Sequence, residues 1–244
     1  RGFDKVINIL GPDHHGYIPR LTAAVMALGY PKEAIKVLIV QLATIYKGEE
    51  QIPMSTRAGE FVTLREVMDD VGKDAARFFF VARKISSHLD FDIELAKKQS
   101  QENPVYYIQY AYARISNIIE FAKKSELEKW DASVFFEAKS LKKQKRPLFQ
   151  AKLDLLAEQE ELNLIKALGQ FPSVVASCSE FLEPCGVVSY LQALANSFHS
   201  FYDKHRVVTD NLELTRARLV LVDCVKIVLS NALKLLGVST PSKM

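Results

Sequence analysis

The chain has 244 residues, of which 48% are hydrophobic and 25% are charged, enough apolar material for one large core or two smaller ones. No apolar run reaches the ~18 to 20 residues of a membrane helix, and no leader of the signal-peptide kind is present. The formal net charge of +3 at pH 7 is only weakly basic, so any contact with a nucleic acid must come from local patches.

The first informative segment is the polar stretch Gly11–Tyr17, which follows the apolar run Val6–Leu10 and precedes an amphipathic segment. This order predicts a strand, a turn and the start of a helix. Ligands of open α/β sheets bind beyond the carboxyl ends of the strands, near helix amino termini. Asp13, His14 and His15 are therefore candidate contacts for the ribose and phosphates of a nucleotide. The alternative is that the histidines only cap the helix. Adjacent histidines point in different directions, which argues against a metal site.

The apolar run Val37–Leu42 predicts a second strand. Residues up to about 42 thus alternate strand, helix and strand, which is typical of a parallel β-α-β unit. The following segment through Gly48 and Gly59 is rich in Glu and Gly and predicts a loop.

From Thr63 onward the pattern is helical almost without interruption. Thr63 and Glu66 have the spacing of a capping box, Gly72 is expected to end that helix, and Asp74 to cap the next one. Pro104 indicates another helix start and a domain boundary. The second half of the chain is therefore predicted to be an all-α bundle.

The predicted helix after Pro104 has two distinct faces. One is apolar and consists of Val105, Ile108, Tyr112, Ile115 and Ile119. Tyr107, Tyr110 and Arg114 fall together on the opposite face. Two aromatic rings and a guanidinium group suit a surface that stacks unpaired bases and binds phosphate. The alternative is a second packing surface, because a helix that is apolar on two sides is often buried.

Later basic segments are less informative. The lysines and arginine between Lys139 and Arg146 are interpreted as a solvated surface without a functional role. Tyr202–Arg206 closes an amphipathic helix, where basic residues also favour the carboxyl end electrostatically. Three cysteines without metal-ligand spacing indicate reduced, structural thiols and a cytoplasmic protein, and no protein-bound metal is predicted.

Several motifs, taken together and in this order, resemble bacterial-type arginyl-tRNA synthetases of class I. They are Gly11–Tyr17, Met54–Leu64, Asp74–Phe80, Ser87–Asp92, Asn103–Ala111, Ser197–Tyr202 and Leu236–Met244. The resemblance implies an α/β plus all-α fold, in which residues 1–62 form the second half of a Rossmann-type catalytic domain. Residues 63–103 would form a helical connecting region, and residues 104–244 an α-helical bundle that binds the anticodon. The His-x-Gly-His signature of class I synthetases is absent, so we expect the carboxy-terminal part of a longer enzyme.

The activity implied by the resemblance is ATP-dependent attachment of arginine to tRNA-Arg through arginyl-adenylate. Arginine, ATP with Mg2+ and tRNA-Arg would be the partners of a monomeric parent enzyme, with no membrane involved. This chain alone is expected to bind tRNA without catalysis. The alternative is a stand-alone tRNA-binding helical module that has no enzymatic activity.

The resemblance also assigns individual residues. Contacts to ATP are implied for Gly11, Asp13, His14, Gln41, Leu42 and Met54, catalytic roles for Ser55 and Arg57, and contacts to the anticodon for Tyr107, Tyr110, Arg114, Arg206 and Met244. The loop that carries Ser55 corresponds to the Lys-Met-Ser-Lys loop of the class. Pro53 and Thr56 replace both of its lysines, so Arg57 is a candidate cation for the ATP phosphates. The alternative is that a residue elsewhere in the longer enzyme replaces the missing lysine.

Overall fold

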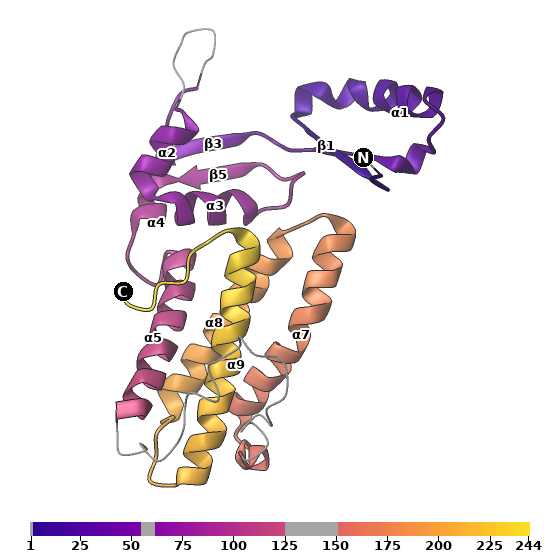
Figure 1. Ribbon diagram of the computed structural model, residues 1–244. Coiled ribbons are helices and arrows are strands. Elements are labelled where there is room, and N and C mark those ends of the chain that lie inside the picture. Colours follow the sequence, from indigo (N-terminus) through magenta and orange to yellow (C-terminus); the bar gives the residue numbers. More distant parts are fainter. Residues whose placement is uncertain (1, 55–61, 125–150) are drawn as a thin grey trace. The chain divides into compact units, whose positions relative to one another are not determined.

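A computed structural model describes residues 2–54, 62–124 and 151–244 of the chain (Figure 1). The chain forms two compact units. The first contains residues 1–97 with 183–185, and the second contains residues 98–182 with 186–244.

The first unit begins with the predicted β-α-β arrangement. Strand β1 (Val6–Leu10) pairs in parallel with β2 (Ile35–Ile39), and Val6 lies opposite Ile35. The 3-10 helices η1 (Pro12–Tyr17) and η2 (Lys32–Ala34) flank helix α1 (Ile18–Ala27) in the crossover between them. The prediction of a strand up to residue 42 is too long. The N–H of Gln41 donates to the carbonyl of Ile85 (2.9 Å), so the chain has left the β1–β2 ladder by that point.

A second sheet has the strand order β4-β3-β5, formed by β3 (Ala43–Lys47), β4 (Glu50–Gln51) and β5 (Leu89–Asp92). The predicted loop through Gly48 and Gly59 is therefore wrong where β3 and β4 form, although Gly48, at φ +64°, does turn the chain between these two strands. Gly59 lies outside the described residues. The prediction of nearly uninterrupted helix after Thr63 is wrong at β5. Strand β5 pairs in parallel with β3, a partner that local periodicity does not reveal.

Helices α2 (Leu64–Val71), α3 (Lys73–Val81) and α4 (Ile93–Lys97) complete the first unit, whose core includes Phe78 and Phe91. The predicted capping box is confirmed, since Thr63 and Glu66 bond reciprocally at the start of α2. Gly72 ends α2 as predicted. The expected cap by Asp74 is wrong: Gly72, at φ +82°, is also the N-cap of α3, and Asp74 lies within its first turn.

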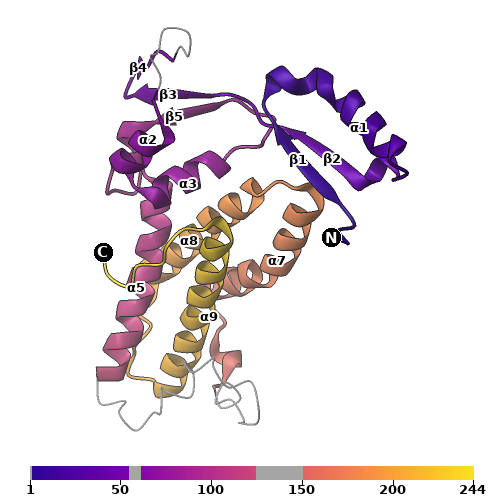
Figure 2. The ribbon, with the colours of Figure 1, turned by 45° about the horizontal axis from the view of Figure 1, so that its top comes forward.

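The second unit is a bundle of long helices, as predicted. It contains α5 (Pro104–Lys124), α7 (Gln159–Phe181), α8 (Cys185–Lys204) and α9 (Leu212–Leu236), with the short helix η5 (Leu153–Leu155) before α7. Helix α9 packs against both α5 and α7 (Figures 1 and 2). The predicted start of α5 at Pro104 is confirmed. Four residues of its predicted apolar face, Val105, Ile108, Ile115 and Ile119, are buried, whereas Tyr112 is partly exposed.

The last residues of the chain run beside α5. Gly237, at φ +70°, ends α9 in the left-handed conformation that favours glycine. The side-chain N–H of Gln109 then donates to the carbonyl of Ser239 (3.1 Å), and Val238 is buried. These contacts fix the course of the tail that leads to Met244. Within the described parts of the chain, no helix has the length and apolar character of a membrane span.

Candidate functional site

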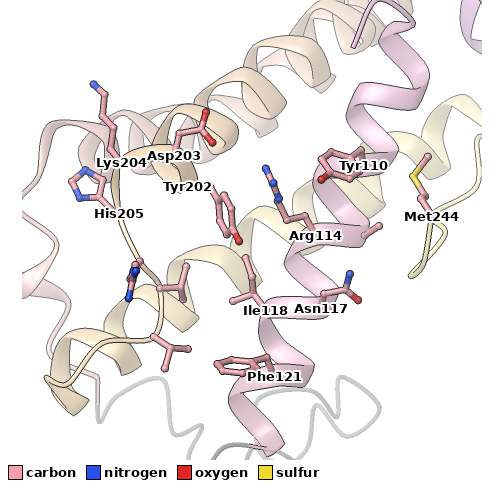
Figure 3. A pocket seen from close by; sticks show the side chains of 14 residues that line it. Tyr110, Arg114, Asn117, Ile118, Phe121, Tyr202, Asp203, Lys204, His205 and Met244 are labelled. Carbon is pink, nitrogen blue, oxygen red and sulfur yellow. The ribbon is translucent and has the colours of Figure 1, made fainter. Parts of the chain in front are cut away.

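A cavity of about 910 Å³ lies in the helical unit. Its wall is formed by α5, by the end of α8 with the following loop, and by the last residue of the chain (Figure 3). It is lined by Tyr110, Ala113, Arg114, Asn117, Ile118, Phe121, Tyr202, Asp203, Lys204, His205, Arg206, Val207, Val208 and Met244. The volume falls in the range of about 300 to 1,000 Å³ that is typical of small-molecule pockets.

Helix α5 supplies one side of this cavity because Tyr110, Arg114, Asn117 and Phe121 recur at helical spacing. The side chains of Tyr110 and Phe121 are 36% and 61% exposed. The apolar face of α5 is therefore buried in the core, whereas the opposite face, which carries Tyr110 and Phe121, is open to solvent at the cavity.

Arg114 lies between two aromatic rings. Its guanidinium carbon is 5.0 Å from the ring centroid of Tyr110 and 4.2 Å from that of Tyr202 (Figure 3). Both distances are within the range of a cation–π contact. Arg114 forms no ion pair with a carboxylate of the described residues, so its charge is held in place by rings and is not neutralised.

Tyr107 has a different environment from Tyr110. Its ring packs on the ring of His199, with centroids 4.4 Å apart, and it does not line the cavity. Burial, and then the negative charge of Asp203, raise the pKa of Tyr107. For Tyr107 the structure favours the packing alternative that the sequence left open, whereas Tyr110 and Arg114 face the cavity.

His199 is buried beneath these tyrosines. Its ring also stacks on Tyr110, with centroids 5.9 Å apart. Burial lowers the pKa of His199, and the charge of Arg114 lowers it further, although a hydrogen bond to the Tyr107 backbone opposes both effects. Its Nε2 atom is buried without a hydrogen-bond partner in the described structure, so a protonated ring is disfavoured here.

The segment after α8 forms the second side of the cavity. Glu160 at the start of α7 accepts hydrogen bonds from Lys204 Nζ (2.5 Å) and His205 Nε2 (3.0 Å). These two contacts, Lys204 first, lower the pKa of Glu160 to about 2. Arg206 is exposed, and its side chain makes no ion pair with the described residues. Arg206 and Arg114 are therefore the unneutralised cations of the cavity lining.

Met244 lines the cavity from the end of the chain, with 51% of its surface exposed. Four of the five predicted anticodon contacts, Tyr110, Arg114, Arg206 and Met244, thus line one cavity although they are far apart in sequence. Tyr107 does not line the cavity, but the ring of His199 packs on both Tyr107 and Tyr110.

Several cavity residues were not predicted individually. Asn117 and Phe121 extend the spacing of Tyr110 and Arg114 along α5, so helical periodicity was a usable signal for both. Tyr202 was part of a recognised motif, but its contact with Arg114 depends on how α5 and α8 pack. Sequence periodicity alone does not give that packing.

The predicted ATP contacts of the first unit lie near the end of the β1–β2 sheet. Gly11 follows β1 and Gln41 follows β2, and the N–H of Val40 donates to the Leu10 carbonyl (2.8 Å), which brings the two strand ends together. Asp13 and His14 are exposed in η1, and Leu42 is exposed before β3. This edge is the expected position of a ligand in a parallel α/β unit.

The capping alternative for the histidines is wrong. Helix α1 begins after Tyr17, which is its N-cap, and no side chain caps it.

The remaining predicted residues of the ATP site belong to the segment after β4. Met54 is 49% exposed and follows β4. Ser55 and Arg57 lie outside the described residues. Among the residues that the structure does describe, no group of three His, Cys, Asp or Glu side chains could hold a metal ion.

Comparison with known proteins gives relatives over the whole chain. It is 49% identical over 244 residues to the arginine–tRNA ligase of Syntrophotalea carbinolica and 48% identical over 246 residues to that of a Geobacter species. Each match covers 100% of this chain and 41% of the relative, so the chain spans about two fifths of their length. The predicted resemblance to the carboxy-terminal part of arginyl-tRNA synthetases is confirmed.

Comparison with solved structures also gives matches over nearly the whole chain. A Campylobacter jejuni protein matches with a TM-score of 0.81 and 33% identity, covering 100% of this chain and 49% of its own. The arginyl-tRNA synthetase of Thermus thermophilus shares the fold, with a TM-score of 0.76 and 22% identity over 99% of this chain and 41% of its own.

The family described as the DALR anticodon binding domain matches residues 108–244, which contain all the residues that line the cavity. The chain belongs to the DALR anticodon binding domain family.

Proposed function

We propose that the helical unit binds the anticodon loop of tRNA-Arg, and that the cavity between α5 and the end of α8 receives its unpaired bases. The observation that carries this proposal is the placement of Arg114 against the rings of Tyr110 and Tyr202, inside the segment that matches the anticodon-binding family. Exposed rings supply stacking surfaces for bases, each worth ~1 to 3 kcal/mol. The guanidinium groups of Arg114 and Arg206 supply partners for phosphate.

The size and chemistry of the cavity support RNA rather than duplex DNA as the ligand. Sequence-specific RNA recognition targets loops whose bases are splayed out, and such bases need concave, partly aromatic sites. Asn117 and Asp203 add donors and acceptors that can read the edges of a base. Met244 offers a flexible apolar contact at the rim.

For the longer protein we propose the activity of the named relatives, the ATP-dependent attachment of arginine to tRNA-Arg. Arginine would attack the α-phosphate of ATP to give arginyl-adenylate and pyrophosphate, and the terminal ribose of the tRNA would then accept the arginyl group. Gly11, Asp13, His14, Gln41 and Leu42 are proposed on the ATP side because they gather at the carboxyl ends of β1 and β2. Met54, Ser55 and Arg57 are proposed near the ATP phosphates, and Mg2+ would accompany ATP.

This chain alone is proposed to bind tRNA without catalysing either step. This chain spans only about two fifths of the length of the named relatives. We also propose that the longer protein is a monomeric, cytoplasmic enzyme, because the chain resembles these relatives.

The direct test is fluorescence anisotropy with a labelled RNA hairpin that carries the anticodon stem and loop of tRNA-Arg. The control is the same stem closed by a stable four-base loop. We expect the native hairpin to bind more tightly at equal salt concentration, because the stem and its charge are shared and only the loop differs. Equal affinity for both hairpins would contradict the proposal.

A further inference from the structure

The helical unit contains a buried ion pair. Nε of Arg218 on α9 donates to Oε1 of Glu161 on α7 (2.7 Å), and their side chains are 8% and 0% exposed. The second carboxylate oxygen of Glu161 accepts the backbone N–H of Glu158 (2.9 Å). Both oxygens are therefore engaged, and the pair is fixed to the first turn of α7.

The same arginine also reaches the wall of the cavity. Nη1 of Arg218 donates to the backbone carbonyl of Arg206 (2.7 Å), directly before the buried residue Val207. Glu160, the neighbour of Glu161, contacts the side chains of Lys204 and His205. Two consecutive carboxylates of α7 thus hold the cavity wall. Glu160 binds the side chains of Lys204 and His205, and Glu161 binds Arg218, which in turn binds the Arg206 backbone.

Packing alone does not explain this arrangement. Burying two charges carries a desolvation penalty, and apolar residues of similar size often serve a core as well or better. The planar fork of an arginine can do what an apolar side chain cannot, because it binds a carboxylate and a backbone carbonyl at the same time. The carbonyl that Arg218 binds is that of Arg206. The side chain of Arg206 is one of the two unneutralised cations of the cavity lining.

We propose that Arg218 is a positioning residue for RNA binding, and that with Glu161 it fixes the backbone at Arg206 and hence the cavity wall. This inference rests on the proposed function, because its first readout is affinity for the anticodon hairpin. Arg218 itself is buried and does not line the cavity.

The test compares Arg218→Met with two controls on the same helix. Arg216→Met removes another arginine, whose ion pair with Glu213 (2.8 Å) lies within α9 and does not reach the cavity wall. Leu229→Ala opens the core 11 residues further on, about 16 Å from Arg218 along the helix, and is expected to lower stability. Glu161→Gln is a second disrupting variant that keeps the shape of the side chain.

The dissociation constant for the anticodon hairpin is measured well below the melting temperature of every variant. We expect Arg218→Met and Glu161→Gln to raise it by about 3- to 30-fold, the range for residues that act on a site without touching the ligand. Arg216→Met and Leu229→Ala should leave it unchanged within error. An effect of Arg218→Met no larger than that of Leu229→Ala would overturn the inference, because loss of stability would then explain it.

Limited trypsin digestion of the full chain gives a readout that needs no RNA. Trypsin cleaves after Lys204 and Arg206, and release of the Arg206 carbonyl should expose this backbone. We expect cleavage after Arg206 to become faster relative to cleavage at other sites in Arg218→Met and not in Arg216→Met or Leu229→Ala, because a loss of global stability speeds cleavage at all sites. If the wild-type chain fails to bind the hairpin, the proposed function fails, whereas equal cleavage after Arg206 in all variants refutes the positioning role by itself.

Discussion

The guanidinium carbon of Arg114 lies 4.2 Å from the ring centroid of Tyr202, and these residues come from α5 and α8. The contact joins two helices at the cavity and orients a cation whose charge is not neutralised. We predict that Arg114→Gln weakens binding of the anticodon hairpin by about 10- to 100-fold and reduces the slope of log Kd against log salt by about one. Anisotropy titrations at several salt concentrations measure both quantities.

Arg114→Lys is the matched control, because it keeps the charge but loses the planar group that stacks on the rings. It should preserve the salt slope and recover only part of the affinity. An unchanged affinity in Arg114→Gln would show that this cation does not contact RNA.

Tyr110 and Tyr107 should behave differently although they are neighbours on the helix. Tyr110 is partly exposed at the cavity, so Tyr110→Ala should weaken RNA binding by about 5- to 100-fold, the effect of one lost stacked base, and should lower stability less than Tyr107→Ala does. Tyr107 packs on His199, so Tyr107→Ala should lower stability by ~1 kcal/mol or more. Thermal denaturation and hairpin titration of both variants separate the two effects. The reverse pattern would contradict the assignment.

Asp223 on α9 should destabilise the fold at neutral pH. Burial raises its pKa to about 6 despite the nearby charges of Lys226 and Lys123. A carboxyl whose pKa is higher folded than unfolded is unfavourable when ionised, so this penalty is complete above about pH 6 and disappears as the pH falls toward 4.

We therefore predict that Asp223→Asn raises the melting temperature at pH 7.5. Solvent screens this partly exposed group, so the expected gain is only ~1 kcal/mol, or about 2 to 4 °C. The melting curves of the variant and the wild type should converge near pH 4. A lower melting temperature of Asp223→Asn at pH 7.5 would mean that attraction to the nearby charges of Lys226 and Lys123 outweighs the desolvation of Asp223.

His199 should make the helical unit sensitive to acid. Its pKa is lowered by burial, so the unfolded chain binds a proton that the folded chain excludes once the pH falls below about 6.5. We predict that the stability of the wild type relative to His199→Phe decreases between pH 7.5 and pH 5. Urea unfolding at several pH values measures this difference.

The capping box of α2 gives a prediction for the first unit. Thr63 accepts the Glu66 N–H (3.1 Å), and Glu66 accepts the Thr63 N–H (2.6 Å). Thr63→Ala should destabilise this unit by ~1 kcal/mol, the usual effect of a lost N-cap. Thr22→Ala is the matched control, because the Thr22 hydroxyl only bonds to the Ile18 carbonyl within α1. Equal stability of Thr63→Ala and wild type in hydrogen exchange of α2 would contradict the prediction.

Features of the fold that depend on neighbours in sequence could be predicted. The capping box at Thr63, the helix start at Pro104 and the buried face of α5 follow from local hydrogen bonding and from periodicity. Strand β5 could not be predicted in this way. Its stability comes from pairing with β3, and Ala43 lies opposite Leu89, 46 residues away.

The same distinction applies to the candidate site. Tyr110 and Arg114 share a helix face, and the sequence therefore grouped them. That Tyr107 faces His199 instead of the cavity depends on the packing of α8, as does the contact of Tyr202 with Arg114. Arg206 and Met244 were predicted only through a resemblance, because nothing in the local pattern brings them to α5.

The most direct test of the proposed anticodon recognition compares two tRNA-Arg transcripts at one salt concentration, one with the native anticodon and one with an altered anticodon. The wild-type chain should prefer the native anticodon by about tenfold or more, equivalent to ~1.4 kcal/mol, and Tyr110→Ala should lose most of this preference. Equal affinity of the wild-type chain for both transcripts would contradict the account, because the cavity would then bind RNA without reading its anticodon.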